Sequence, residues 1–138
     1  MTTRTLKYAD ITVGDELPVR ALPITTSLIV SGALATRDFE PLHHDKAAAQ
    51  AIGMSDVFMN ILTSQGLMET YVTDWSGPET VIRKLALRLG GPNFPGDTMT
   101  ITGTVSAKTE GLVEVEVTGK NERWGTHMTG VVSIALPQ

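Results

Sequence analysis

An acidic side chain and an imidazole stand close together in segment 38–45, which reads Asp-Phe-Glu-Pro-Leu-His-His-Asp. Pro41 lies between Asp38 and His43. Because proline fixes its own φ and favours an extended conformation at the residue before it, we expect this segment to be a rigid loop rather than a helix. Imidazole titrates near neutral pH, so the two side chains could together take a proton from water and deliver one to carbon. The segment is a candidate acid/base site.

Two other interpretations of this segment stay open. Asp38 could cap a turn while His43 lies on the surface, with Asp45 serving only as the N-cap of a helix. A metal site at His43, His44 and Asp45 is less well supported, because adjacent side chains rarely point at one ion and the chain contains neither an HExxH nor a CxxC pattern. We expect neither a metal nor a cofactor.

A glycine near the start of a helix expected over residues 60–72 is a second candidate. Glycine inside a helix costs about 1 kcal/mol relative to alanine. If Thr63 or Ser64 is the N-cap, the N–H of Gly66 lies in the first turn, where it has no partner and the helix dipole is positive. It could then stabilise negative charge on a ligand carbonyl oxygen, as an oxyanion hole does. Close packing of the helix against a sheet explains this glycine equally well.

Apolar periodicity predicts the elements that position these residues. Helices are expected over 27–35 and 45–52, the second capped by Asp45 and ended by Gly53. In 60–72 the apolar residues spread around the helix and predict burial on most sides. Alternation in 81–89, 98–105, 112–117 and 128–136 predicts four antiparallel strands. The 138 residues are expected to form one α+β domain, a curved sheet around a central helix.

Composition excludes several classes of function. The net charge of −4 argues against a nucleic-acid partner. The absence of cysteine excludes disulfides and thiol nucleophiles. No apolar run approaches the roughly 20 residues of a membrane span, and the N-terminus lacks the apolar stretch of a signal peptide. We expect a cytoplasmic protein that does not bind a membrane.

Together the two candidate segments resemble the MaoC-like family of R-specific enoyl-CoA hydratases, over about residues 29–105. Asp38, Pro41, His43 and Asp45 match the family pattern D-x-N-P-x-H-x-D, and segment 66–68 (Gly-Leu-Met) stands in the place of its H-G-M-L block. The resemblance implies a hot-dog fold and the addition of water to an enoyl-CoA thioester. It implies the following roles: catalysis by Asp38, His43 and Gly66, and substrate binding by Pro41, Ser64 and Leu67.

The sequence departs from the family pattern at two positions. Glu40 replaces the usual asparagine, and Gln65 precedes Gly66 where the family has histidine. Because the asparagine helps to hold the loop, Glu40 is expected to change its hydrogen bonding or to add a charge that raises the proton affinity of His43. We expect hydration to be kept, with a shifted substrate range.

Segments 33–39, 43–45, 60–63, 71–75 and 87–90 carry a narrower resemblance, to the small subunits of actinobacterial steroid side-chain enoyl-CoA hydratases. This implies a bulky steroid acyl-CoA substrate and pairing with a second MaoC-like chain in a heterotetramer, or with itself in a homodimer. Two alternatives stay open: a hot-dog thioesterase that hydrolyses the same thioester, and a non-catalytic subunit that shapes the pocket of its partner.

Overall fold

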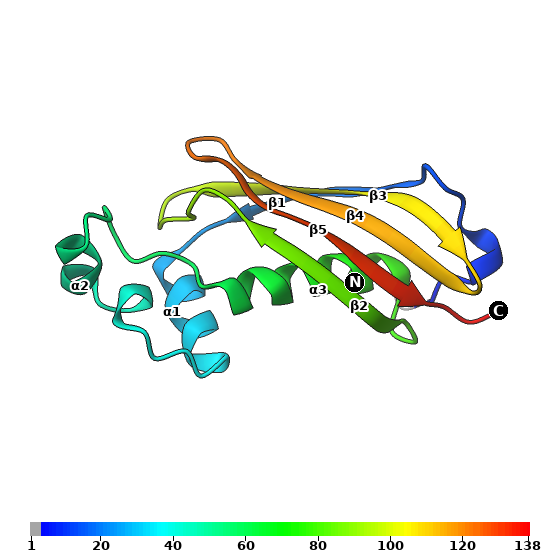
Figure 1. The fold of residues 1–138 in the computed structure, drawn as a ribbon, viewed down its shortest axis with the longest axis horizontal. Coiled ribbons are helices and arrows are strands. Elements are labelled where there is room, and N and C mark those ends of the chain that lie inside the picture. Colours follow the sequence, from blue (N-terminus) through cyan, green and yellow to red (C-terminus); the bar gives the residue numbers. More distant parts are fainter. Residues whose placement is uncertain (1–3) are drawn as a thin grey trace.

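A computed structural model describes residues 4–138. A five-stranded antiparallel sheet of order β1-β3-β4-β5-β2 curves over one long helix, α3, which lies along one of its faces (Figure 1). The strands are β1 (Glu16–Pro23), β2 (Val81–Leu89), β3 (Thr98–Thr109), β4 (Leu112–Asn121) and β5 (Gly125–Ala135). The helices are α1 (Thr26–Ala35), α2 (Lys46–Ala51) and α3 (Ile61–Ser76), with single 3₁₀ turns η1 (Tyr8–Asp10) and η2 (Pro41–His43).

The four strands predicted from alternation are confirmed. In β4, Val113, Val115 and Val117 are buried while Glu114 and Glu116 between them are exposed, because successive side chains of a strand point to opposite faces. These strands bury their apolar side chains against the buried face of α3 in a single core. The predicted combination of α+β class and curved sheet is therefore correct.

Strand β1 was not predicted. It contains Pro18 and ends at Pro23, and prolines argue against a strand because they cannot donate to a ladder. The structure accommodates them because β1 is an edge strand that pairs only with β3, with an irregular register between Leu17 and Arg20. Proline is tolerated at such an edge.

Helix α3 begins earlier than Gly66 would suggest, and its exposed residues are Ile61, Leu62 and Thr70. Its N-cap is Asn60, and it ends at Ser76 before the C-cap Gly77, whose φ of 103° glycine adopts readily. Ile61 and Leu62 are 50% and 42% exposed. Apart from Thr70, the other residues of α3 are buried or half-buried, so the prediction of a helix buried on most sides holds beyond its first two residues. The buried residues of α3 are Thr63, Ser64, Met68, Tyr71, Val72 and Ser76.

The predictions for α1 and α2 are confirmed. Asp45 caps α2 by accepting hydrogen bonds from the N–H groups of Ala47 and Ala48. Both helices lie near the start of α3, beyond one end of the sheet (Figure 1). Gly32 allows α1 to approach α3, because a Cβ at this position would collide with the side chain of Thr63. This close contact brings the segment that follows α1 next to the start of α3.

No helix within residues 4–138 is long and apolar enough to cross a membrane.

Candidate active site

Asp38 and His43 lie side by side, as the sequence predicts for an acid/base pair. His43 Nε2 is 3.5 Å from Asp38 Oδ2, and His43 is 8% exposed. Asp38 follows a turn at the end of α1, where Arg37 has a φ of 57° and the Asp38 N–H donates to Ala33 O at 2.9 Å. The sequence predicts a rigid, non-helical loop here, but Pro41 begins the 3₁₀ turn η2. Proline is well suited to the first position of a helical turn.

The second ring nitrogen of His43 is held by the backbone. Nδ1 lies 2.7 Å from Phe58 O. Because a carbonyl oxygen can only accept, Nδ1 carries the hydrogen of the neutral imidazole. Nε2 therefore presents its lone pair toward Asp38 when the ring is neutral, and donates toward the carboxylate when the ring is protonated. The ring of Phe58 packs edge-on against His43 at a centroid distance of 5.0 Å.

Asn60 holds the Asp38 carboxylate, and the sequence reasoning assigned no role to this residue. Asn60 Nδ2 donates to Asp38 Oδ2 at 2.9 Å, and the N–H of Glu40 donates to Asp38 Oδ1 at 3.2 Å. The hydrogen bond from Asn60 has the largest effect and that from Glu40 the next largest, and both keep the pKa of Asp38 below its ordinary value. A charged His43 adds to the effect. Glu40 thus supports the site through its backbone.

The start of α3 differs from the expectation for Gly66. Asn60 Oδ1 accepts from the N–H of Thr63 at 3.0 Å, and Asn60 O accepts from the N–H of Ser64 at 3.2 Å. Gly66 is the sixth residue of α3, so its N–H is bonded inside the helix and the prediction that it lies free in the first turn is wrong. The N–H groups without an intrahelical acceptor are those of Ile61 and Leu62, at the positive end of the helix dipole.

The three residues predicted to contact substrate lie in different environments. Ser64 is fully buried, and its hydroxyl lies 2.8 Å from His127 Nε2 and 3.2 Å from Asn60 O, so it is occupied within the chain. Leu67 is half-buried and packs against the core, and Pro41 is exposed. A role for these residues in substrate binding stays a prediction.

His127 on β5 is a buried titratable residue that the sequence reasoning did not single out. It is 2% exposed, and its Nδ1 lies 2.7 Å from Gly91 O. Burial lowers its pKa, although the hydrogen bond to Gly91 opposes this. A neutral ring with its proton on Nδ1 can accept the Ser64 hydroxyl at Nε2. The ring thus fastens the first turn of α3 to the sheet.

Comparison with known proteins agrees with this geometry. The family model described as "MaoC like domain" matches residues 11–125. The chain belongs to the MaoC-like domain family. This MaoC-like chain is 47% identical over 124 residues to the 3-oxo-4,17-pregnadiene-20-carboxyl-CoA hydratase beta subunit of Mycobacterium tuberculosis, covering 90% of this chain and 95% of that protein.

Solved structures give the same result for the fold. A chain in the ChsH1–ChsH2 complex from Mycobacterium tuberculosis has a TM-score of 0.88 and 46% identity, covering 91% of this chain and 98% of that one. The R-hydratase PhaJ1 from Pseudomonas aeruginosa has a TM-score of 0.89 over 99% of this chain and 88% of its own, at 21% identity. The predicted hot-dog fold is confirmed, as is the predicted resemblance to the steroid side-chain hydratase subunits.

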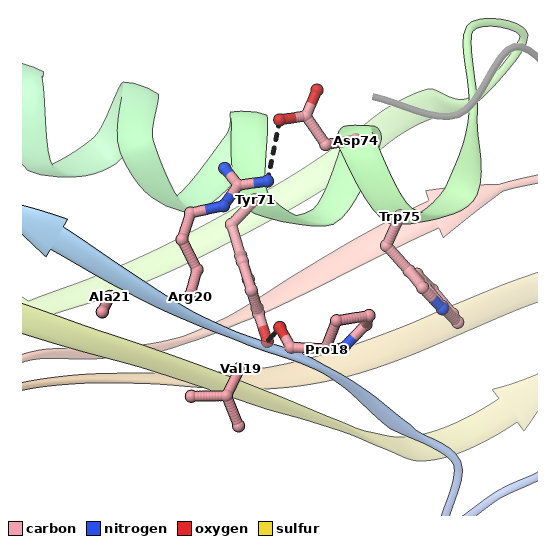
Figure 2. Close-up of a pocket in the computed structure, with 7 residues that line it drawn as sticks. All are labelled: Pro18, Val19, Arg20, Ala21, Tyr71, Asp74 and Trp75. Carbon is pink, nitrogen blue, oxygen red and sulfur yellow. Dashed lines mark hydrogen bonds and ion pairs between the residues drawn. The ribbon is translucent and has the colours of Figure 1, made fainter.

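Two cavities of the MaoC-like chain differ in their relation to the acid/base pair. One, of about 210 Å³, lies beside Phe58, whose carbonyl holds His43, and also includes Met54, Met59 and His127 in its walls. The other, of about 430 Å³, lies between β1 and the second half of α3 (Figure 2). Its Arg20 forms an ion pair with Asp74 at 2.8 Å and lies over the ring of Tyr71. Asp38 and His43 line neither cavity, and the first cavity is connected to the candidate site through Phe58.

Groups of three or more His, Cys, Asp or Glu side chains arranged to hold a metal ion do not occur in the described part of the chain.

Proposed function

We propose that this chain carries the catalytic residues of an enoyl-CoA hydratase that adds water to the double bond of a bulky, steroid-type 2-enoyl-CoA. The observation that carries the proposal is the pairing of His43 Nε2 with Asp38 Oδ2 at 3.5 Å beside the start of α3. Proton acceptors and backbone donors thus lie close together. Conjugate addition of water to an unsaturated thioester requires both.

The water molecule is activated between the two side chains. A neutral His43 and an ionised Asp38 both accept hydrogen bonds, so one water can donate one O–H to each. As the water oxygen forms a bond to the β-carbon, His43 Nε2 takes the proton, with Asp38 orienting the water and stabilising the imidazolium. The electron pair of the double bond moves toward the thioester oxygen. The imidazolium then delivers its proton to the α-carbon, so that one water is added overall.

The thioester oxygen is stabilised at the start of α3. Negative charge develops on this oxygen during addition, and it is suited by the helix dipole and by the N–H groups of Ile61 and Leu62, which have no acceptor among residues 4–138. Donors of this kind typically contribute about 10²–10³ in rate. Asn60 links the capped helix start to Asp38, so the donors and the acid/base pair keep a fixed spacing.

A second MaoC-like chain completes the substrate pocket in this proposal. The cavity beside Phe58 holds about 210 Å³, whereas pockets for drug-sized ligands measure about 300–1,000 Å³. Phe39, next to Asp38, is 64% exposed, and Ile61 and Leu62, next to Asn60, are 50% and 42% exposed. Apolar side chains exposed around a site are typical of surfaces that another molecule covers. The relative found within the ChsH1–ChsH2 complex supports the same arrangement.

The test compares the chain alone and co-produced with a MaoC-like partner, using 3-oxo-4,17-pregnadiene-20-carboxyl-CoA and crotonyl-CoA as substrates. Loss of enoyl absorbance without release of free thiol is expected. Release of thiol would instead identify a thioesterase. Asp38→Asn and His43→Ala should each lower hydration at least ~10²-fold, as removal of a general acid/base does.

His44→Ala is the matched control, because His44 is the exposed neighbour of His43. It should keep the activity of the unmodified protein, and all three variants should unfold at similar temperatures. If Asp38→Asn and His43→Ala both hydrate at the rate of His44→Ala within an active complex, this chain only shapes its partner's pocket and the proposal is wrong.

A further inference from the structure

The structure assigns Asn60 as a positioning residue that holds the acid/base carboxylate and the helix-start donors in one rigid unit. The inference rests on the proposed hydration. It adds the residue that fixes the spacing between the acid/base pair and the N–H donors at the start of α3. Asn60 is 2% exposed, so it does not meet the substrate itself. Its effect is exerted through Asp38 and the first turn of α3.

Every hydrogen-bonding group of the Asn60 amide has a partner. Oδ1 accepts from the N–H of Thr63 at 3.0 Å, while Nδ2 donates to Thr36 Oγ1 at 3.0 Å and to Asp38 Oδ2 at 2.9 Å. The amide cannot be flipped, because a flip would point its two N–H groups at the Thr63 N–H and its oxygen at the carboxylate. One side chain therefore sets both the cap of α3 and the orientation of Asp38.

Asn60 is itself held by a series of hydrogen bonds through buried residues of α3 and β5. Its carbonyl accepts from the Ser64 N–H at 3.2 Å, and the Ser64 hydroxyl donates to His127 Nε2 at 2.8 Å. His127 in turn reaches Gly91 O at 2.7 Å. A buried chain of hydrogen bonds thus runs from the sheet to Asp38. Such a satisfied network fixes geometry, and a displacement of about 1 Å at a reacting group can cost about 10² in rate.

The titratable groups around this unit are few. His43, from η2, faces Asp38 at 3.5 Å, and His127, from β5, lies beneath Ser64. Glu40 reaches Asp38 with its backbone N–H. A change in the titration of Asp38 on substitution of Asn60 can therefore be followed together with that of two histidines.

Two substitutions keep an oxygen that can cap α3 but change the group that faces Asp38. Asn60→Ser removes the donor to the carboxylate. Asn60→Asp replaces the donor by a second carboxylate at about the same position, and two carboxylates this close share a proton, so that one of them titrates at higher pH. Each is measured in the protein co-produced with its MaoC-like partner, with crotonyl-CoA and 3-oxo-4,17-pregnadiene-20-carboxyl-CoA as substrates.

For Asn60→Ser we expect kcat to fall about 10–100-fold with KM changed less than about threefold, because positioning is lost but substrate contacts are not. For Asn60→Asp we expect the acidic limb of the rate profile to move up by at least about one pH unit. A residue that only stabilises the fold would lower the unfolding temperature and leave the pH profile unmoved. That outcome, or a kcat unchanged in Asn60→Ser, overturns the inference.

Carbon-13 NMR of the Asp38 carboxyl group separates this inference from the proposed function. The carboxyl should titrate at higher pH in both variants than in the unmodified protein. If it does so while the unmodified protein hydrates neither substrate, the positioning of Asp38 stands and the hydratase proposal fails. If hydration is found but neither this titration nor the rate profile moves, Asn60 is not a positioning residue and the hydratase proposal stands.

Discussion

Replacing two helix glycines, Gly32 and Gly66, by alanine should change the stability of the protein in different ways. Gly32 lies inside α1 and Gly66 inside α3. In a helix interior, replacing glycine by alanine gains up to about 1 kcal/mol of stability through backbone entropy alone. Helix propensity therefore predicts the same stabilisation for Gly32→Ala and Gly66→Ala. The surroundings of the two positions decide the difference.

At Gly66 an added Cβ meets no heavy atom within 4 Å, so Gly66→Ala should raise the free energy of unfolding by about 0.5–1 kcal/mol. At Gly32 it would collide with Oγ1 and Cγ2 of Thr63 and lie tightly against its Cβ, and this β-branched residue cannot rotate freely in a helix. Overpacking of this kind costs about 1–3 kcal/mol. Gly32→Ala should therefore be less stable than Gly66→Ala by about that amount.

Urea unfolding of both variants, followed by circular dichroism, measures the difference. Because Asp38 follows α1 and is bonded to Asn60 at the start of α3, Gly32→Ala should also lower kcat at least about tenfold. Equal stability of the two variants would refute the close contact between α1 and α3. A loss of about 10² in kcat for a well-folded Gly66→Ala would show that the thioester oxygen approaches Gly66 after all.

Three further predictions follow from buried polar groups. Thr63 Oγ1 is buried without a hydrogen-bond partner among the described residues, so Thr63→Val should stabilise the protein by about 1 kcal/mol in urea unfolding, and a loss would contradict this. Asn121 Nδ2 donates to Asn93 Oδ1 and Asp97 Oδ2, both at 2.8 Å, so Asn121→Ala should cost about 1–3 kcal/mol, checked by thermal unfolding. Because burial lowers the pKa of His127 in the folded protein, the unfolded chain takes up that proton first, and stability should fall as the pH drops below about 6.5. His127→Gln should flatten this part of the stability profile measured by urea unfolding between pH 7 and 5, and an unchanged slope would exclude His127 as the cause.

Elements governed by local rules were predictable from the sequence. Alternating valines gave β4, and Asp45 followed by alanines and Gly53 gave both ends of α2. The neighbourhood of Asp38 and His43 was predictable for the same reason, because Pro41 restricts the short chain between them. Strand β1 was not, because its prolines contradict the local rule and only its place at the edge of the sheet makes them acceptable.

The start of α3 could not be chosen from local rules. Asn60, Thr63 and Ser64 are all good N-cap residues. Asn60 prevails because its amide also satisfies Thr36 and Asp38 from α1 and the segment after it, a tertiary interaction that no periodicity reveals. The placement of Gly66 in the first turn failed for this reason. His127 could not be found either, because its partners Ser64 and Gly91 lie far away in the sequence.

In the proposed assembly, this chain supplies the reacting groups and the second chain supplies apolar walls. The two parts of the site need different positional accuracy. Proton transfer and charge stabilisation depend strongly on distance, and here Asp38, His43 and the first turn of α3 are all held by hydrogen bonds within one chain. Apolar walls tolerate larger variation, since an added or missing methylene changes binding by only about 1–3 kcal/mol. A second chain can therefore supply such walls without disturbing the reacting groups. Exchange of the partner for another MaoC-like chain should consequently alter KM for steroid and short enoyl-CoA substrates far more than the pH dependence of hydration, which in the proposed function is set by Asp38 and His43 of this chain.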